Sequence, residues 1–490
     1  MSDDKKLTTR ADDFSAWYNE VVLRSELADY SPVKGSMVIR PNGYGIWERM
    51  QRALDDMFKA SGHVNAYFPL FIPQSFIAKE AKHVEGFAPE LAIVTHGGGK
   101  ELEEPLVVRP TSETIIYHMY AKWVQSYRDL PILINQWANV VRWEMRTRLF
   151  LRTLEFLWQE GHTAHATHDE AEAEAITILG IYRKFAEEWM AMPVLTGLKS
   201  DNERFAGALR TYCIEAMMQD RKALQAGTSH NLGQNFSKAF DLKFQTETGT
   251  EEFAWNTSWG VSTRMVGGLV MTHGDDSGIV TPPRLAPIEV VIVPIWKTND
   301  DRAGMVEAAM KLKAELTDWT GRGESDRLRV HVDARDGIRS GAKYYEWEMR
   351  GVPLRLELGA KDLEKQSVFS ARRDTRVKAP IPRAGAPAAV ADLLKTIQSD
   401  LFAAALARRE AATIRGVTEY GQFKEIMAGD GGFVYAGWNG DPAVEARVKE
   451  ETKATIRVIP DAEFRSATAP AKCLVTGEPA KYEVVWAKAY

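Results

Sequence analysis

The segment from Asn139 to His162 places charged residues within stretches that otherwise have the composition of buried strands. Residues 132–143 are mostly aliphatic and aromatic, residues 144–148 are charged, and residues 150–158 are again mainly apolar. Two apolar runs on either side of a short polar stretch predict two strands joined by a basic loop. The unusual feature is the charge that these strands carry inward.

Several of these charged residues share a face of the predicted strands. Arg142 and Glu144 are two residues apart, so their side chains point to the same side of the first strand. Such a face is costly to desolvate unless a polyanionic ligand or internal ion pairs satisfy its charges. One face of the return strand carries Arg152, Leu154, Phe156, Trp158 and Glu160.

This combination of side chains suits a nucleotide. Guanidinium groups bind phosphate and carboxylate oxygens, and a phenyl ring can stack on a purine. The alternative is a half-exposed hairpin whose charges pair only with one another. From this segment alone both interpretations stay open, because charge clusters also occur in purely structural networks.

Composition limits the class of protein. A chain of 490 residues with 26% charged and 45% hydrophobic residues is long enough for about two to four globular domains. The sequence has no run of about 18 apolar residues and its first residues lack the apolar core of a signal peptide, so we expect no membrane span. Its two cysteines, Cys213 and Cys473, lie far apart, which predicts a cytoplasmic protein without a disulfide framework. The net charge of −5 requires any nucleic-acid binding to be local.

Four short motifs follow one another along the chain. They are Arg109-Pro110-Thr111-Ser112-Glu113; Arg142-Trp143-Glu144 with Arg152-x-x-x-Phe156-x-x-x-Glu160; GTSHNLGQNF from Gly227 to Phe236; and GIVTPPR from Gly278 to Arg284. In this order they resemble the class II aminoacyl-tRNA synthetases, and the prolyl-tRNA synthetase family of the archaeal and eukaryotic type in particular. The resemblance runs from about Phe14 to Tyr490.

The resemblance implies a multidomain α+β and α/β protein. It predicts a class II catalytic domain over 1–286 on an antiparallel sheet, an α/β anticodon-binding domain over 287–410, and a small α+β C-terminal module over 411–490. Within the catalytic domain, motif 1 falls at about 44–69, motif 2 at about 139–162 and motif 3 at about 274–286. Motif 1 implies a homodimer. The short distance from Glu160 to Gly278 leaves no room for the editing insertion of bacterial-type relatives.

Hydrophobic periodicity and capping residues predict the local elements. The alternation from residue 288 onward indicates a small α/β domain with a mixed sheet. The predicted helices lie within 1–35 and at 44–60, 110–127, 167–190, 212–225, 301–319, 340–350 and 387–414. The predicted strands include 64–68, 106–109, 253–264, 267–273, 288–295, 328–333, 353–358 and 366–371, with a turn at 227–230.

The resemblance also implies a reaction and a site. Proline and ATP form prolyl-adenylate, with Mg²⁺ on the phosphates, and the prolyl group passes to the 3′ end of tRNA(Pro). Arg142, Arg264 and Arg284 are the expected catalytic residues. Proline is expected to bind at Thr111, Glu113, Arg142 and His230. ATP is expected at Arg142, Glu144, Arg152, Thr153, Phe156, Gln225, Thr228, Ser262, Arg264 and Arg284, with Gln225 near the Mg²⁺. Glu348, Arg355 and Lys361 match positions that read anticodon bases.

The C-terminal module departs from the family pattern. Relatives of this type often carry four cysteines that bind zinc, but here Asn439, Val444 and Thr476 stand at three of those positions and only Cys473 is kept. One thiolate cannot complete a tetrahedral zinc site, so we expect no zinc. Packing should hold the module instead, through Phe433, Tyr435, Trp438, Ile456, Val458, Val484 and Trp486.

Two other patterns carry less weight. The sequence from His96 to Lys100 is glycine-rich but lacks the GxxxxGK[ST] spacing of a phosphate-binding loop, so we expect a flexible loop. His162, His165 and His168 recur every third residue, but a strand would turn His165 away from the other two, which disfavours a metal site.

Two other functions are compatible with the fold. A synthetase-like paralogue could act as a regulator or scaffold, but it should then have lost its ATP-binding arginines, which are present here. An enzyme that adenylates an acceptor other than tRNA should lack an anticodon domain, whereas 287–410 resembles one.

Overall fold

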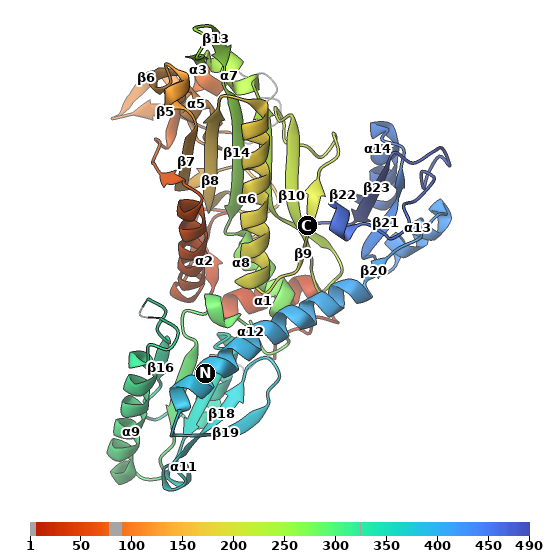
Figure 1. Cartoon of the computed structure of the whole chain (residues 1–490). Helices are drawn as coiled ribbons and strands as arrows, with labels where there is room; N and C mark the ends of the chain where they lie inside the picture. Colours follow the sequence, from red (N-terminus) through yellow and green to blue (C-terminus); the bar gives the residue numbers. More distant parts are fainter. Residues whose placement is uncertain (1–5, 78–90, 324) are drawn as a thin grey trace.

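The computed structural model describes residues 6–77, 91–323 and 325–490, so residues 1–5, 78–90 and 324 of the predicted domain ranges lie outside it. Figure 1 shows three parts in chain order: a large sheet with its helices, a smaller α/β unit below it, and a C-terminal unit at its side. Each part has a buried hydrophobic core of its own. The architecture is therefore the α+β and α/β combination that the sequence predicts.

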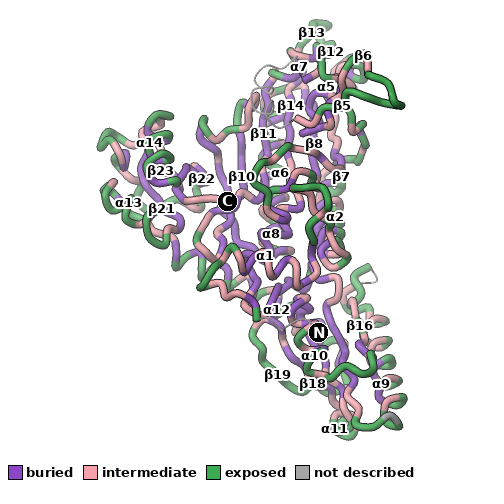
Figure 2. The backbone as a smooth tube through the Cα atoms, turned by 180° about the vertical axis from the view of Figure 1, so that it is seen from behind, coloured by how far each residue is buried: buried purple, intermediate pink, exposed green. Residues whose placement is uncertain are grey.

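The large sheet is antiparallel apart from its edge strand β3, which pairs with β7 in parallel. Its spatial order in this part is β9-β10-β11-β14-β8-β7-β3, and Figure 2 shows the central strands β8, β10, β11 and β14 as mainly buried. The strands are β3 (Val64–Asn65), β7 (Ile132–Val141), β8 (Glu155–His165), β9 (Val194–Leu198), β10 (Arg210–Met217), β11 (Ala223–Gly233) and β14 (Trp255–Ser262).

Helices cover one face of this sheet and leave the middle of the other face to a pocket. α6 lies across the strands in Figure 1 and packs with α1, α2 and α8 around one core. α5 and α7 cover the far end of the opposite face. The helices are α1 (Phe14–Arg24), α2 (Pro41–Ala60), α3 (Gln74–Ile77), α5 (Glu113–Trp123), α6 (His168–Glu188), α7 (Asn235–Phe240) and α8 (Arg264–His273), with short 3₁₀ turns η2 (Tyr127–Asp129) and η3 (Pro283–Leu285).

The remaining strands of this part form two hairpins, β1-β2 and β12-β13, and a three-stranded sheet of order β4-β6-β5. The segment from His96 to Lys100, predicted as a flexible loop, is the tip of the hairpin between β5 and β6. Gly98 and Gly99 both have positive φ there, which glycine adopts without strain. These strands are β1 (Ala28–Tyr30), β2 (Met37–Ile39), β4 (Phe71–Pro73), β5 (Ala92–Gly97), β6 (Lys100–Val108), β12 (Lys243–Gln245) and β13 (Glu251–Phe253).

Three predicted elements of this part are wrong. The predicted helix 212–225 is the hairpin of β10 and β11, and the predicted turn 227–230 lies inside β11. Both strands are buried on both faces, so their sequence lacks the alternation that marks a half-exposed strand. The predicted strand 267–273 belongs to α8, whose residues from Met265 to His273 are all buried. A helix that is apolar all round cannot be told from a buried strand by periodicity.

The predicted hairpin of motif 2 is confirmed, but its return strand begins later. β8 starts at Glu155 instead of Phe150, and residues 142–154 form the connection. Arg142, Glu144 and Arg152 therefore lie in this connection, whereas Phe156 and Glu160 lie on the strand.

The α/β unit has a mixed sheet in the order β16-β15-β17-β18-β19, parallel over the first three strands and antiparallel beyond them. This confirms the predicted alternation; β19 and the short helix α11 were not predicted. The elements are β15 (Val290–Pro294), α9 (Asn299–Asp318), β16 (Val330–Val332), α10 (Ser340–Met349), β17 (Leu354–Leu358), α11 (Ala360–Glu364), β18 (Ser367–Arg372), β19 (Lys378–Pro382) and the long helix α12 (Ala386–Ala411).

The C-terminal unit extends the large sheet. Its strands follow the order β20-β21-β23-β22, and β22 pairs with β9 through Ile459–Leu198 and Pro460–Gly197. The eleven strands are therefore continuous. No helix among the described residues is long and apolar enough to cross a bilayer. The elements are β20 (Thr413–Ile414), α13 (Tyr420–Ala428), β21 (Phe433–Trp438), α14 (Pro442–Thr452), β22 (Thr455–Pro460), η4 (Ala462–Phe464) and β23 (Tyr482–Ala487).

Candidate active site

A pocket of about 310 Å³ lies over the open middle of the large sheet. Three adjacent strands, β8, β14 and β11, form its floor, and their paired residues make rows across it. The rows are His162–Ser258–His230, Glu160–Gly260–Thr228 and Trp158–Ser262. Gly260 has no side chain, so the centre of the floor stays open. A Cβ at this position would come 3.0 Å from the Gln159 carbonyl oxygen.

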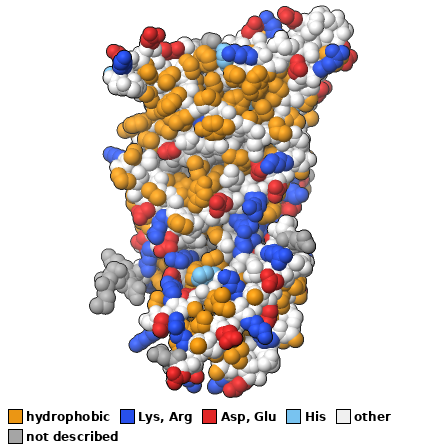
Figure 3. Space-filling model, turned by 90° about the vertical axis from the view of Figure 1, so that its left-hand side faces the viewer, with side chains coloured by type: hydrophobic (Ala, Val, Ile, Leu, Met, Phe, Trp, Pro, Cys, Tyr) orange, Lys and Arg blue, Asp and Glu red, His pale blue; other side chains and the backbone are white. Residues whose placement is uncertain are grey.

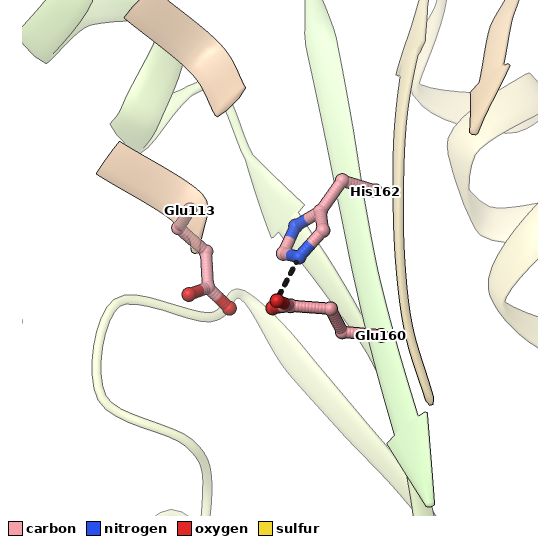
Figure 4. Close-up of side chains that lie close together, drawn as sticks. All are labelled: Glu113, Glu160 and His162. Carbon is pink, nitrogen blue, oxygen red and sulfur yellow. Dashed lines mark hydrogen bonds and ion pairs between the residues drawn. The ribbon is translucent and has the colours of Figure 1, made fainter. Parts of the chain in front are cut away.

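Two carboxylates and a histidine meet at one end of the pocket. Figure 4 shows Glu113 pointing from the start of α5 toward Glu160 and His162 on β8. All three are buried, and one oxygen of each carboxylate and one ring nitrogen of His162 lie within 4.8 Å of one another. Glu160 Oε2 accepts a hydrogen bond from His162 Nε2 at 2.9 Å, and Oε1 accepts one from Gln136 Nε2 at 2.8 Å.

Glu160 fixes the entry to α5 as well. Its carboxylate accepts hydrogen bonds from both the backbone N–H and the hydroxyl of Ser112, the residue before α5. The Thr111 hydroxyl donates to Glu113. Burial disfavours a charged His162, but its bond to Glu160 and the charges of Glu113 and Glu160 outweigh burial and raise its pKa. This end of the pocket is thus anionic and rigid, which suits an ammonium group.

His230 forms the side wall of the same end. Its ring stacks on Phe205 with centroids 4.6 Å apart, and its Nδ1 lies 2.9 Å from the Thr211 hydroxyl. Burial lowers the pKa of His230 to about 4. The imidazole is therefore neutral near pH 7 and adds no charge that would repel a cation.

The other end of the pocket is cationic. Arg264 is the first residue of α8, and burial, together with the charges of Arg152 and Arg142, lowers its pKa to about 10. The Arg142 guanidinium lies 5.5 Å from the centre of the Phe156 ring and donates to the Pro110 carbonyl at 3.1 Å. Several guanidinium groups gathered at one place favour binding of an anion with several charges.

The pocket brings together most of the predicted site residues. The predicted residues among its lining are Thr111, Glu113, Arg142, Phe156, Gln225, Thr228, His230, Ser262 and Arg264. Sequence reasoning assigned no role in the site to Trp158, Glu160, His162, Phe205, Ser258 and Gly260, which also line it. The alternation along β8, which places residues 156, 158, 160 and 162 on one face, was the signal available for three of these.

Arg284, predicted as a catalytic residue in motif 3, does not reach this pocket. It lies in η3, stacks over Trp189 at 5.6 Å, and lines a separate groove against α12. Arg264, which was also predicted as a catalytic residue, does reach the pocket, from the N-terminus of α8.

Thr153 and Glu144 also lie away from the pocket lining. The Thr153 hydroxyl donates to the Glu155 carbonyl at 2.7 Å, and the residue lines a cavity beside residues 30–36. Glu144 pairs with Arg152 at 3.6 Å in the connection between β7 and β8. Arg152 nevertheless lies close enough to Arg264 for its charge to act on the pKa of Arg264.

The three predicted anticodon residues differ in their surroundings. Arg355 on β17 is buried, pairs with Glu348 at 2.7 Å and Glu357 at 3.0 Å, and stacks on Tyr344. Glu348, which is also a predicted anticodon residue, is thus the ion-pair partner of Arg355. Lys361 in α11 is exposed.

The four positions predicted to correspond to zinc-binding cysteines, residues 439, 444, 473 and 476, provide a single thiolate. Glu478 accepts hydrogen bonds from the Asn439 amide at 2.8 Å and the Thr476 hydroxyl at 3.1 Å. Cys473 and Val444 are buried in the core of the unit. A carboxylate thus joins two of the positions that cysteines would otherwise occupy, and the predicted packing residues Phe433, Tyr435, Trp438, Ile456, Val458, Val484 and Trp486 are all buried.

We predict that the C-terminal unit folds without zinc. Structural zinc contributes on the order of 10 kcal/mol of binding free energy, so a domain that depends on it unfolds under a chelator. Elemental analysis of the purified protein should find no stoichiometric zinc. A zinc-selective chelator, used with Mg²⁺ in excess, should leave the melting temperature unchanged. One zinc per chain near Cys473 would contradict the prediction.

Comparisons with known proteins agree with the sequence motifs. A family model of the class II tRNA synthetase core domain (G, H, P, S and T) matches residues 94–273, a model of an anticodon binding domain matches 289–393, and a model of the prolyl-tRNA synthetase C-terminal region matches 420–490. The proline--tRNA ligase of Chlorobium phaeobacteroides (strain BS1) is 58% identical over 489 residues, 99% of each chain. Those of Chlorobium chlorochromatii (strain CaD3) and Chlorobaculum tepidum are each 57% identical over 490 residues, with 99% of both chains covered.

Proposed function

Since the chain belongs to the proline--tRNA ligase family of class II synthetases, we propose that it joins L-proline to the 3′ end of tRNA(Pro) in two steps. A proline carboxylate oxygen attacks the α-phosphorus of ATP, and the bond to the bridging oxygen breaks to release pyrophosphate. A terminal ribose hydroxyl of tRNA then attacks the prolyl carbonyl carbon, and AMP leaves. The three relatives named above are all proline--tRNA ligases, so a regulatory or non-tRNA paralogue finds no support in these comparisons.

One observation carries this proposal: a single pocket has an anionic end and a cationic end. At the anionic end, Glu113 and Glu160 with neutral His230 suit the secondary ammonium group and apolar ring of proline. At the cationic end, Arg142 and Arg264 suit the proline carboxylate and the ATP phosphates. Neither step needs an enzyme nucleophile, so positioning and electrostatic stabilisation carry the catalysis.

The nucleotide end has groups for the base, the ribose and the metal. Phe156 offers a ring face to the adenine, and Gln225, Thr228 and Ser262 offer polar groups on the floor. Mg²⁺ prefers oxygen ligands and keeps several waters and phosphate oxygens, so the single amide oxygen of Gln225 fits it. The ion would neutralise phosphate charge; orientation of ATP is the task of Arg142, Arg264 and the floor.

Exchange of labelled pyrophosphate into ATP, measured with each amino acid in turn, tests the proposed first step. Proline should support exchange, and tRNA(Pro) should then be charged. Exchange that does not depend on proline, or that another amino acid supports better, would contradict the proposal.

The proposed homodimer rests on an exposed apolar face. Figure 3, which views the left-hand side of Figure 1, shows hydrophobic side chains gathered over the upper part of that face. β3, β4 and β5 and the link after β3 expose Val64, Tyr67, Phe71 and Ile93, all at least 45% exposed. Contiguous apolar surface of this kind marks interaction sites. Light scattering of the purified protein distinguishes one chain from two.

The predicted domain ranges and the cytoplasmic location complete the proposal. Residues 1–286 would bind proline and ATP, 287–410 the anticodon, and 411–490 would brace the large sheet, which β22 extends. Two cysteines that are free and buried accord with a reducing compartment.

We predict that Lys361→Ala weakens charging of tRNA(Pro) but leaves proline-dependent pyrophosphate exchange unchanged. Lys361 is exposed in α11, away from the ATP pocket, and a lost contact to a base costs about 1–3 kcal/mol. Lys365→Ala, which removes an exposed lysine one turn further on, is the matched control. An equal fall in exchange would contradict the separation of the two domains.

A further inference from the structure

The C-terminal end of α10 forms one of the contacts between the α/β unit and the large-sheet part, beside those of Arg329 and of α12, and we call it the joint. The last carbonyl groups of a helix lack partners within the helix. Here they are satisfied mainly by the other part of the chain. The Ser25 hydroxyl donates to the Met349 carbonyl at 2.6 Å and the Asn42 amide to that of Arg350 at 3.4 Å, while the backbone N–H groups of Ile279 and Thr281 donate to the carbonyls of Met349 and Gly351, both at 3.3 Å.

Arg373 lies at this joint, and all three nitrogens of its guanidinium group donate hydrogen bonds there. Nη1 and Nη2 each lie 2.7 Å from an oxygen of Asp275, and Nε donates to the Glu348 carbonyl at 2.7 Å. The Arg373 side chain is 2% exposed, so the fork is almost completely desolvated. Burial opposes a charged Asp275, but the hydrogen bonds and charge of Arg373 lower its pKa, so the pair is ionised. A lysine could not reproduce this geometry, because it lacks the planar fork.

Asp275 ties this pair to the part that holds the ATP pocket. One residue, Gly274, separates Asp275 from the end of α8, and α8 begins at Arg264 in the pocket. The Asp275 carbonyl accepts a hydrogen bond from Trp17 Nε1 at 3.0 Å, so the loop is fixed to α1. On the other side, the Glu348 carboxylate pairs with Arg355 on β17. One short chain of contacts thus joins the proposed anticodon face to the end of the helix that carries Arg264.

We propose that Arg373 is a positioning residue for tRNA charging: it holds the α/β unit in the orientation in which the anticodon and the 3′ end of one tRNA engage together. The inference rests on the proposed function. A ligand held at two sites gains affinity from the second contact only if the geometry allows both at once, and this gain reaches about 10²–10⁴. Without the Arg373 contacts, the anticodon site and the ATP pocket each stay intact, but their relative orientation varies more widely.

The test compares two enzymes on two RNAs. Wild type and Arg373→Ala are each assayed for charging of tRNA(Pro) and of a transcript with altered anticodon bases, and the ratio of kcat/KM values gives the anticodon penalty. We expect Arg373→Ala to lower kcat/KM on tRNA(Pro) by roughly tenfold or more, because simultaneous engagement is lost. We also expect its anticodon penalty to shrink toward one, with proline-dependent pyrophosphate exchange retained.

A merely structural role gives a different result. General damage would lower charging of both RNAs equally and leave the penalty unchanged, which would overturn the proposal. So would wild-type charging by Arg373→Ala, or a wild-type enzyme with no anticodon penalty. If wild type lacks proline-dependent exchange, the proposed function itself fails.

Three further variants keep the test decisive. Arg376→Ala is the matched control, because Arg376 lies 3.6 Å from the same Asp275 but is 62% exposed, and it should behave as wild type. If Arg373→Ala does not fold, Arg373→Lys and Asp275→Asn take its place: both nearly keep side-chain size, the first removes the planar fork, and the second removes the carboxylate charge that the fork binds. An unchanged penalty in both would overturn the inference.

Discussion

Replacing Arg142 with alanine is expected to abolish proline-dependent exchange of pyrophosphate into ATP while leaving the fold intact. Arg142 lies at the cationic end of the pocket, where the proline carboxylate must meet the α-phosphate and where negative charge increases in the transition state. Removing one preorganised charge at such a place costs roughly 3 kcal/mol or more, or about 10²–10³ in kcat. The exchange rate at saturating ATP and proline measures this loss directly.

The matched control is Arg146→Ala. Arg146 lies four residues further on in the same connection, but it is exposed and does not line the pocket. Its removal should change exchange little, since a solvated charge contributes weakly. Melting temperatures close to wild type in both variants would exclude unfolding as the cause. Near wild-type exchange by Arg142→Ala would contradict the assignment of this pocket.

The floor of the pocket was largely predictable from sequence. Alternation along β8 places residues 156, 158 and 160 on one face, and only a ligand or internal pairing can satisfy the charge there. The structure supports both interpretations at once. Glu160 is held by Ser112, Gln136 and His162, and the pocket above it is open to a ligand.

The position of the second pocket arginine was not predictable from local pattern. α8 is buried all round and therefore shows no helical period, so its first residue could not be recognised as a helix N-terminus. Gly267 and Gly268 weaken the helical signal further, although both are needed for packing: a Cβ at Gly267 would lie 2.6 Å from Leu151 Cδ2. Arg284, which only the family resemblance placed in the site, lies in another groove.

Sequence pattern predicts Arg355 as a contact to an anticodon base but does not show the ion pairs that it makes in the fold. Arginine binds guanine edges well, but it binds carboxylates with the same fork. In the fold, β17 brings Arg355 beside Glu357, and the end of α10 brings Glu348. Which partner an arginine meets depends on contacts distant in sequence, so only the fold distinguishes a base-reading arginine from a paired one.

The sequence also gave no sign that the C-terminal unit continues the large sheet. Composition predicted a buried, aromatic module, and the aromatic residues are buried. The pairing of β22 with β9 joins residues about 260 positions apart, and short-range pattern contains no information about such a register. The junction of β22 with β9 contains a buried cluster of charged side chains, and we expect its loss to have a large effect on stability.

Replacing Glu215 with glutamine is expected to destabilise this junction by about 3–5 kcal/mol, the usual cost of breaking a buried ion pair. Glu215 on β10 is fully buried and accepts hydrogen bonds from Lys199 Nζ at 2.6 Å and Arg457 Nη2 at 3.0 Å. The Glu215 carboxylate supplies the negative charge that compensates Lys199 and Arg457. Glutamine would leave both cations buried without a counter-charge. Amide hydrogen exchange along β9 and β22, with chemical unfolding of the whole chain, measures the loss.

Glu463→Gln is the matched control for this prediction. Glu463 also joins the C-terminal unit to the large-sheet part, through Arg183 of α6 at 2.5 Å, but its side chain is 54% exposed. Water already solvates an exposed pair, so its loss should cost no more than about 1 kcal/mol. Equal effects of the two substitutions would show that burial does not determine the strength of the junction. A stable Glu215→Gln protein would mean that Lys199 or Arg457 can reach water when the carboxylate is lost.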